Sequence, residues 1–232
     1  MEFDKDVKLP KILVGCPTSN HKSYCIDKYI ESVKSLDYPN YDILLVDNSQ
    51  NDDYYNKLKS KLPVVKSPYY ETARKRITES RNILRDKALR EGYDYFFSLE
   101  QDVIPPKDVI SLLLNHKKKI VSALYFDVNP EDRSLMPMAW VHYQGSKARR
   151  MFLSEVFSPG RVLEVVTCGL GSVLIHRDVL EKIKFRYVPE RRPFDDLWFS
   201  VDAKEANFPV YLDPSIKCRH LIKEWSWDKI KK

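Results

Sequence analysis

The sequence predicts an α/β fold in which helices flank a mostly parallel central sheet. Early in the chain, apolar runs of strand length alternate with stretches that carry apolar residues at helical spacing. This order is typical of a parallel sheet that is covered on both faces. The apolar runs end in polar, turn-forming residues. With 232 residues, of which 43% are hydrophobic, the chain is long enough for one domain with a full core.

The first part of the chain contains the most regular pattern. A helix is expected after the first strand, because apolar residues recur at positions 26, 29, 30, 33 and 36. A longer helix is expected over 72–90, where Gly92 provides the stop. The expected strands of this part cover 11–16, 41–46, 64–67 and 93–99.

The second part of the chain is less regular. Polar stretches at 127–135 and 144–158 separate its apolar runs, and a loop at 185–193 precedes its last predicted helix. Apolar runs cover 120–125, 138–143, 163–167, 172–176 and 208–213, and helices are expected over 177–183 and from 195 to about 207. No internal repeat or linker divides the chain, so one continuous domain is expected.

Composition narrows the functional classes. The formal charge of +6 comes from 39 basic and 33 acidic residues, a mixture too even to indicate a nucleic-acid partner. A modest basic excess is compatible with a small polyanion such as a nucleoside diphosphate. No apolar run is long enough to span a bilayer and no signal peptide begins the chain, so a cytoplasmic location is expected. The four cysteines form no C-x-x-C pair and are expected to be reduced.

An acidic end to an apolar run is the most informative local feature. The run at 96–99 is followed by Glu100 and Asp102, and then by two prolines. Buried carboxylates are normally paired or bound to a cation, and Mg²⁺ and Mn²⁺ prefer oxygen ligands. The segment therefore predicts a site for a metal ion and a diphosphate. The alternative is an exposed acidic turn.

Three predicted strands place polar residues at the same edge of the sheet. Thr18 and Asn20 follow the first strand, 47–49 follows the second, and the acidic pair follows the fourth. Ligands of parallel α/β sheets bind outside the carboxyl ends of the strands. We therefore expect one binding site there.

Several short motifs, taken in order, resemble the GT-A glycosyltransferases, particularly the family-2-like group. The resemblance covers 11–221 and is carried by Cys16-Pro17-Thr18, Val46-Asp47-Asn48-Ser49, Glu79-Ser80-Arg81-Asn82, Glu100-Gln101-Asp102, Gly169 to Arg177, Asp195-Asp196, Ala206 to Pro214 and His220. It implies a GT-A, Rossmann-like domain over 1–232. Residues 9–106 would form the nucleotide-sugar-binding half, 107–221 the acceptor half and 222–232 a C-terminal tail.

The resemblance also implies a nucleotide-sugar site. Its predicted residues are Pro17, Thr18, Asp47, Asn48, Ser49, Arg81, Asn82, Glu100, Gln101 and Asp102. An Asx-turn after a strand is the alternative for Asp47. A solvated helix face is the alternative for any single arginine near Arg81.

A metal site is implied at Asp102, Glu100 and His220. The family's usual first Asp is Glu100 here, so Asp102 is the safer ligand. A coordination sphere made of carboxylate, imidazole and phosphate ligands suits Mn²⁺ slightly better than Mg²⁺. A histidine that is merely part of the core or surface is the alternative for His220.

Catalytic and acceptor residues follow from the same resemblance. Asp196 is predicted to be the base of an inverting reaction and Asp195 to cap the helix that begins there; N-capping is also the alternative for Asp196. The predicted acceptor side comprises Trp140, Gly169, Leu170 and Gly171. The aromatic and basic tail at 225–232 could contact a membrane surface at the cytoplasmic face.

The predicted function is transfer of a sugar from a UDP- or GDP-sugar to a hydroxyl acceptor, which could be a glycan, a glycolipid or a small molecule. One alternative is a domain that binds nucleotide sugars or glycans without turnover. Another is a sugar nucleotidyltransferase, although 16–21 lacks the Gly-rich basic loop that such an enzyme normally has. A nucleic-acid binder is the most distant alternative.

Overall fold

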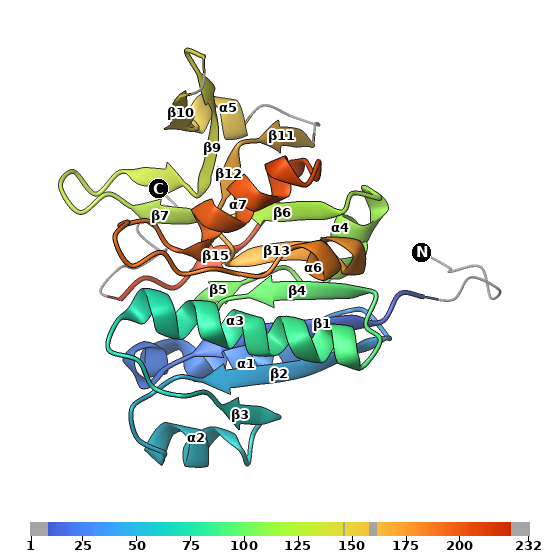
Figure 1. The fold of residues 1–232 in the computed structure, drawn as a ribbon, viewed down its shortest axis with the longest axis vertical. Helices are drawn as coiled ribbons and strands as arrows, with labels where there is room; N and C mark the ends of the chain where they lie inside the picture. Colours follow the sequence, from blue (N-terminus) through green and yellow to red (C-terminus); the bar gives the residue numbers. More distant parts are fainter. Residues whose placement is uncertain (1–8, 146, 158–161, 224–232) are drawn as a thin grey trace.

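The central feature of the computed structural model is an eight-stranded sheet, seen face-on in Figure 1 with its strands stacked from top to bottom. The structure describes residues 9–145, 147–157 and 162–223. Across the sheet the strands are β11 (Leu163–Val165), β14 (Val210–Lys217), β6 (Ile120–Leu124), β13 (Ser172–His176), β4 (Tyr95–Leu99), β1 (Ile12–Thr18), β2 (Tyr41–Asp47) and β3 (Val64–Lys66). All but β11 and β13 point the same way. The predicted mostly parallel α/β sheet is confirmed.

The register of the parallel strands brings their polar ends together. Every residue of β1 is buried, because β2 and β4 flank it on either side. Thr18 at the end of β1 pairs with Asp47 at the end of β2, and Asp47 pairs in turn with Lys66 of β3. The carboxyl ends of these strands therefore lie at one edge, which is on the left in Figure 1.

Helices cover both faces of the sheet (Figure 1). Side chains of β4 alternate between the two faces, with Phe96 in one apolar cluster and Phe97 in the other. The cluster around Phe96 includes residues of α3 (Ala73–Arg90), α6 (Arg177–Lys182) and α7 (Asp195–Glu205). The cluster around Phe97 includes residues of α1 (Ile26–Lys34), α2 (Asp53–Leu58) and α4 (Val109–Asn115).

Short elements build up the carboxyl edge beyond the main sheet. They are a 3₁₀ helix η1 (Asn20–Cys25), strands β5 (Val103–Ile104), β7 (Phe126–Val128), β8 (Leu135–Pro137), β9 (Ala139–Tyr143), β10 (Lys147–Arg150), β12 (Thr167–Cys168) and β15 (Arg219–His220), and helix α5 (Leu153–Val156). Antiparallel pairing of β15 with β5 places His220 opposite Val103. This pairing brings the C-terminal end of the described chain beside the acidic strand end.

The structure differs from the sequence predictions mainly in the short elements. Helices α2 (six residues) and α4 (seven residues) were not predicted. The strand predicted over 163–167 divides in two. Val165 pairs with β14, whereas Thr167 pairs with Trp140 of β9, so the chain changes sheet at Val166.

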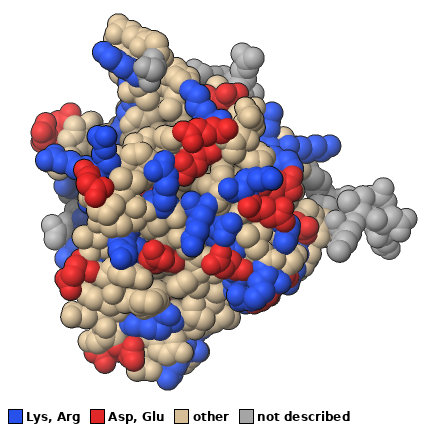
Figure 2. Space-filling view, viewed as in Figure 1, with Lys and Arg blue, Asp and Glu red and all other residues tan. Residues whose placement is uncertain are grey.

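The predicted tail at 225–232 lies outside the described residues. Within the described chain, no helix combines the length and the apolar character needed to cross a membrane. Lys and Arg are interspersed with Asp and Glu over the face shown in Figure 2. On that face the charges form no single basic stripe.

Candidate functional site

Two adjoining cavities lie at the carboxyl edge of the sheet. The smaller, of about 200 Å³, is lined by Pro17, Thr18, Asn48 and Arg76 among others, and we call it the Pro17 cavity. The larger, of about 360 Å³, contains both predicted catalytic aspartates, and we call it the Asp196 cavity. Both are lined by Lys22, Ala73, Ile77 and Glu100. A ligand could therefore extend from one cavity into the other.

The Pro17 cavity has a polar side and an apolar side. Thr18 ends β1, and the backbone N–H of Asn48 donates to the Thr18 carbonyl at 2.9 Å, which joins the ends of β1 and β2. Ala73 and Ile77, on the first turns of α3, form the apolar side. An apolar wall beside a few fixed polar groups is the usual composition of a small-molecule site.

Asp47 and Ser49 lie behind this cavity and do not line it. The Asp47 carboxylate accepts hydrogen bonds from the Ser49 backbone N–H at 3.0 Å and from its hydroxyl at 2.6 Å. Its other oxygen is 2.9 Å from Nζ of Lys66. With both oxygens engaged and the side chain buried, Asp47 forms the Asx-turn that was the alternative prediction.

Gln101 is also directed into the protein. Its side-chain carbonyl accepts from the Thr18 hydroxyl, and its amide donates to the Tyr54 hydroxyl at 2.8 Å. The same amide donates to the backbone carbonyl of Lys22 at 2.5 Å. Gln101 therefore connects the end of β4 to η1 and α2, and its amide group is fully used in doing so.

Glu100 and Asp102 follow the end of β4 and both line the Asp196 cavity, and Glu100 also lines the Pro17 cavity. Nζ of Lys22 lies 2.9 Å from Oδ2 of Asp102 and 3.5 Å from Oε2 of Glu100. Burial alone would raise the pKa of Asp102, but the hydrogen bond to His220 and the Lys22 charge lower it to about 2. The pKa of Glu100 is lowered in the same way: Lys22 and Arg81 outweigh its burial. Both carboxylates are therefore ionised at neutral pH.

Arg81 links the acidic strand end to the second half of the protein. Its side chain is 2% exposed. One terminal nitrogen donates to both oxygens of Asp195 at 2.5 and 2.7 Å, and the other donates to Glu100. The solvated-face alternative therefore does not apply to Arg81. Breaking a buried ion pair by removing one partner is typically strongly destabilising.

The predicted capping role of Asp195 is wrong. The N-cap of α7 is Phe194, and Asp195 is the first helical residue with its carboxylate turned to Arg81. A buried carboxylate is stabilised more by a guanidinium than by one backbone N–H, because the guanidinium neutralises its charge. Asp195 is thus a structural partner of Arg81 within the Asp196 cavity.

Burial raises the pKa of both aspartates at the start of α7, but among the described residues only Asp196 of the two lacks an arginine on its carboxylate, since Arg81 is bound to Asp195. Burial, followed by the charge of the adjacent Asp195, raises the pKa of Asp196 to about 6. Its Oδ1 accepts from the Leu197 N–H at 2.8 Å. A carboxylate with such a pKa can accept a proton near neutral pH and release it again.

The loop that leads to Asp196 is fastened to the polar face of α3. Asn82 exchanges two hydrogen bonds with the Phe185 backbone, at 2.9 and 3.1 Å. Arg85 Nε donates to the Ile183 carbonyl at 2.8 Å, and Arg74 donates to the Arg191 carbonyl. Asn82 therefore holds the loop and lines neither cavity.

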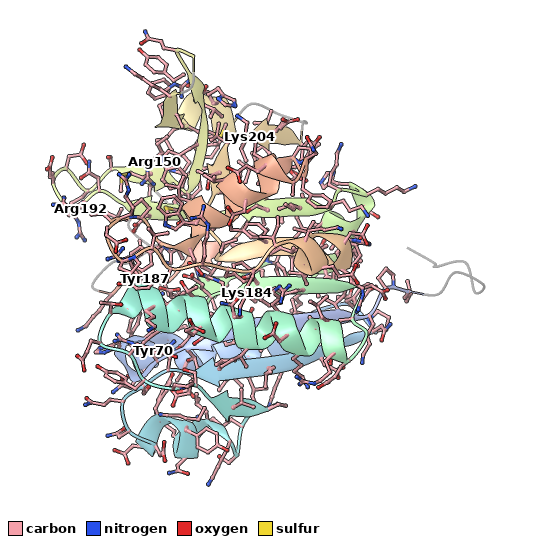
Figure 3. All side chains as sticks on the ribbon, in the orientation of Figure 1. Tyr70, Arg150, Lys184, Tyr187, Arg192 and Lys204 are labelled. Carbon is pink, nitrogen blue, oxygen red and sulfur yellow. The ribbon has the colours of Figure 1, made fainter. Side chains whose placement is uncertain are left out.

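Figure 3 shows where part of this loop lies relative to α3. Tyr187 lies beside the N-terminal end of α3, and Tyr70 lies on the same side of the molecule. The guanidinium of Arg74 is 5.2 Å from the ring centroid of Tyr187. The loop thus contacts α3 along most of its length before α7 begins.

Tyr125 forms the inner wall of the Asp196 cavity and was not predicted. Its hydroxyl accepts from the Gly171 N–H at 3.1 Å. A Cβ on Gly169 would lie 2.0 Å from this hydroxyl, and one on Gly171 would lie 2.8 Å from it. The two predicted glycines therefore make room for the tyrosine ring, while Leu170 between them lines the cavity itself.

Trp140 lies apart from both cavities. It is half-buried on β9, and the guanidinium of Arg150 is 4.5 Å from its ring centroid. Asp127 of β7, by contrast, lines the Asp196 cavity although no motif pointed to it. Tyr125 and Asp127 therefore line this cavity, whereas Trp140 does not.

The predicted metal ligands are brought only partly together. Nε2 of His220 lies 3.2 Å from Oδ2 of Asp102, and Nδ1 lies 2.9 Å from the Phe126 carbonyl. Glu100 is engaged by Arg81 and Lys22 instead. Within the described ranges, no group of three or more His, Cys, Asp and Glu side chains is arranged to hold a metal ion. As they stand, the residues present do not fit a divalent cation.

Lys22 is the most important residue that the sequence analysis missed. A lone lysine in the loop after the first strand belongs to no motif. Its relation to Glu100 and Asp102 depends on a contact across some 80 positions of sequence. The available signal was the acidic pair itself, since buried carboxylates require a cation from somewhere.

Comparison with known proteins supports the fold alone. No protein-family model matches the chain, and no curated protein matches it in sequence. Among solved structures, it is similar to "GalNAc-T7 with UDP, GalNAc and Mn2+", with a TM-score of 0.66 and 14% identity over 97% of this chain and 46% of that chain. It is also similar to "A197 from STIV", with a TM-score of 0.50 and 18% identity over 92% of this chain and 87% of that one.

These similarities confirm the expected GT-A type of α/β fold. The chain spans about half the length of the GalNAc-T7 chain that it matches. At such identities fold similarity does not determine activity, which has to be argued from the site.

Proposed function

We propose that this protein is a glycosyltransferase that moves a sugar from a nucleotide-sugar donor to a hydroxyl acceptor, with inversion at the anomeric carbon. The observation that carries the proposal is the pair of adjoining cavities at the carboxyl edge, with Asp196 in the larger one. The GT-A type of fold, shared with a protein crystallised with UDP, supports a UDP- or GDP-linked donor.

The two cavities suggest how a donor is bound. The Pro17 cavity, with its apolar wall and polar strand ends, suits the nucleoside. The shared residues Lys22 and Glu100 then lie where the chain of phosphates passes into the Asp196 cavity. The sugar occupies that second cavity beside Asp196. This arrangement leaves the side near Tyr125 and Asp127 for the acceptor.

The chemistry is a single displacement. Asp196 takes the proton of the acceptor hydroxyl as its oxygen forms a bond to the anomeric carbon. The bond from that carbon to the diphosphate oxygen breaks, and its electron pair leaves with the nucleoside diphosphate. A raised pKa of about 6 suits Asp196 to this role, because the base is ionised at pH 7 yet still takes up a proton readily.

Arg81 and Asp195 support this step by position. Their buried ion pair fixes the start of α7, and so fixes where the next residue, Asp196, lies. The Arg81 contact to Glu100 extends the same connection to the end of β4. The Arg81 side chain therefore helps to position both Asp196, through the neighbouring Asp195, and Glu100 on the donor side.

The predicted Mn²⁺ or Mg²⁺ cofactor remains a prediction, and no step is assigned to it. In the related fold of GalNAc-T7 a structure contains Mn²⁺. In this chain Glu100 is already engaged by two cationic side chains. The location of the protein and any contact with a membrane also remain predictions.

The test of the proposal is Asp196→Asn. This substitution keeps the shape of the side chain and removes the proton acceptor. We expect transfer to fall by about 10²- to 10⁴-fold, while binding of UDP or GDP, measured by calorimetry, is unchanged. The matched control is Asp202→Asn, on the same helix, where the carboxylate pairs with Arg186 instead.

Two outcomes would contradict the proposal. If Asp196→Asn retains full turnover, Asp196 is not the base. If the product keeps the configuration of the donor, the single displacement is wrong. A protein that binds UDP-sugars in a hydrolysis assay but never consumes them, with any acceptor, would instead be the non-catalytic binding domain.

A further inference from the structure

Lys22 occupies an unusual position at the junction of the two cavities. It belongs to η1, directly after β1, and is one of only four residues that line both cavities in the described chain. Its backbone carbonyl accepts from the buried amide of Gln101. The backbone at Lys22 is therefore fixed to the acidic strand end independently of what its side chain does.

The ammonium group of Lys22 lies between the two carboxylates. It is within 2.9 Å of Asp102 and 3.5 Å of Glu100, the two residues from which a metal site was predicted. The Asp102 side chain is 5% exposed, so its negative charge is well shielded from water. A divalent cation at these oxygens would lie within a few ångströms of the ammonium and be repelled by it.

We propose that Lys22 takes the place of a divalent cation in this site and binds the diphosphate of the donor directly. This inference rests on the proposed nucleotide-sugar function. An ammonium group carries three N–H donors, and two carboxylate contacts leave one for a phosphate oxygen. Lysine is a common phosphate ligand, acting as a point charge.

The surrounding cations do not replace Lys22 in this role. Both terminal nitrogens of Arg81 are engaged by Asp195 and Glu100. Arg76, on the Pro17 cavity, donates to the backbone carbonyls of Tyr70 and Glu71. Lys22 is the basic side chain that reaches both cavities in the described chain, and so it can contact the link between nucleoside and sugar.

The same contact assists the chemical step. When the bond between the anomeric carbon and the diphosphate oxygen breaks, negative charge grows on that diphosphate. A fixed N–H donor beside it stabilises this charge without any exchange of ligands. The proton balance is unchanged, because Lys22 stays protonated and the acceptor proton goes to Asp196.

Two measurements on the full chain test the inference, with Lys28→Ala as a matched control on the exposed face of α1. The first is calorimetry with UDP and GDP in EDTA and again with Mn²⁺. The wild-type protein should bind UDP or GDP in EDTA. For whichever of the two binds more tightly, addition of Mn²⁺ should change the affinity by less than about twofold. Lys22→Ala should lose about tenfold or more in EDTA, and Lys22→Arg should lose much less.

The second measurement follows Mn²⁺ alone by electron paramagnetic resonance and needs no nucleotide. Wild type should take up no tightly bound Mn²⁺, whereas Lys22→Ala should gain a site that a further His220→Ala substitution removes. Thermal melting of each variant shows whether it is folded.

The possible failures are distinguishable. A wild-type protein that needs Mn²⁺ to bind nucleotide, or that takes up one Mn²⁺ in a way that depends on Asp102, would overturn the role of Lys22. Absence of nucleotide binding in every condition would overturn the proposed function. In that case the Mn²⁺ uptake of Lys22→Ala would still decide whether the lysine occupies a cation position.

Discussion

The ends of the parallel strands and the loop before α7 contribute to the site in different ways. At the strand ends, the polar residues that resemble a nucleotide-sugar motif mostly bind one another: Asp47 engages Ser49 and Lys66, and Gln101 engages Thr18. The loop before α7 has no such motif and leads into the two aspartates that begin the helix. Yet it delivers Asp196, the residue best suited to proton transfer.

This difference shows that polar residues at strand ends can form hydrogen bonds with one another within the protein and so stabilise it, without contacting a ligand. Parallel strands end close together, so their polar side chains can satisfy each other, and buried polar groups are stabilised by doing so. The polar groups of a loop have no neighbouring strand with which to form hydrogen bonds. Here the loop is held by α3 instead, and Asp196, in the first turn of α7, remains available to the cavity.

The largest effect on stability is expected from Arg81→Met, which removes the connection between the two regions. Asp195 and Glu100 would lose their shared partner, and Asp195 is 1% exposed. We expect the free energy of unfolding to fall by about 3–5 kcal/mol in urea denaturation. Arg90→Met, at the exposed end of the same helix, should change it by about 0.5 kcal/mol or less. A loss below about 1 kcal/mol for Arg81→Met would show that the two regions are not coupled through this residue.

The pH dependence of sugar transfer tests the role of Asp196, the residue that follows the loop. Because Asp196 must be ionised to act as a base, and its pKa is about 6, kcat/KM should rise with pH up to about 6 and then level off. Each pH unit below 6 should lower the rate by about tenfold. Initial rates over pH 4.5–8 measure this, with folding checked at each pH. A profile that is flat between pH 5 and 7 would exclude Asp196 as the titrating base.

Asn82→Ala tests whether α3 holds the loop. The substitution leaves the N–H and C=O groups of Phe185, which is 3% exposed, without their partners. We expect a loss of about 1–3 kcal/mol in stability. Hydrogen exchange should increase mainly in 183–193, and transfer should fall although Asn82 lines neither cavity. An unchanged exchange rate in that loop would argue against the fastening.

The smallest effect on ligand binding is expected from Asp47→Asn, at the strand ends. If Asp47 serves internal order, the variant should lose about 1–3 kcal/mol of stability while nucleotide affinity changes by about threefold or less. Asp52→Asn is the control, since Asp52 is 72% exposed and contacts the same Lys66 at 3.5 Å. A tenfold or larger loss of UDP or GDP affinity in Asp47→Asn would restore its predicted role in binding the nucleotide.

Site residues could be predicted from the sequence only where residues adjacent in the chain form a recognisable pattern. Glu100 and Asp102 were found because carboxylates at the end of an apolar run are conspicuous locally, and Asp196 was found through the family resemblance of its short motif. Asn82 and Gln101 were assigned to the ligand, but their amides are used by Phe185 and Tyr54. A motif shows which residue types are present and does not show which partner each one finds.

By itself, the sequence determined the sheet, the long helix α3 and the edge at which the site lies, because periodicity and strand-end polarity are properties of neighbouring residues. Only the tertiary structure decided that Arg81 pairs with Asp195, that Tyr125 packs on two glycines, and that Lys22 lies between Glu100 and Asp102. These contacts join positions 44 to 114 residues apart in the sequence. Such pairings follow from the packing of whole elements, which no local pattern records.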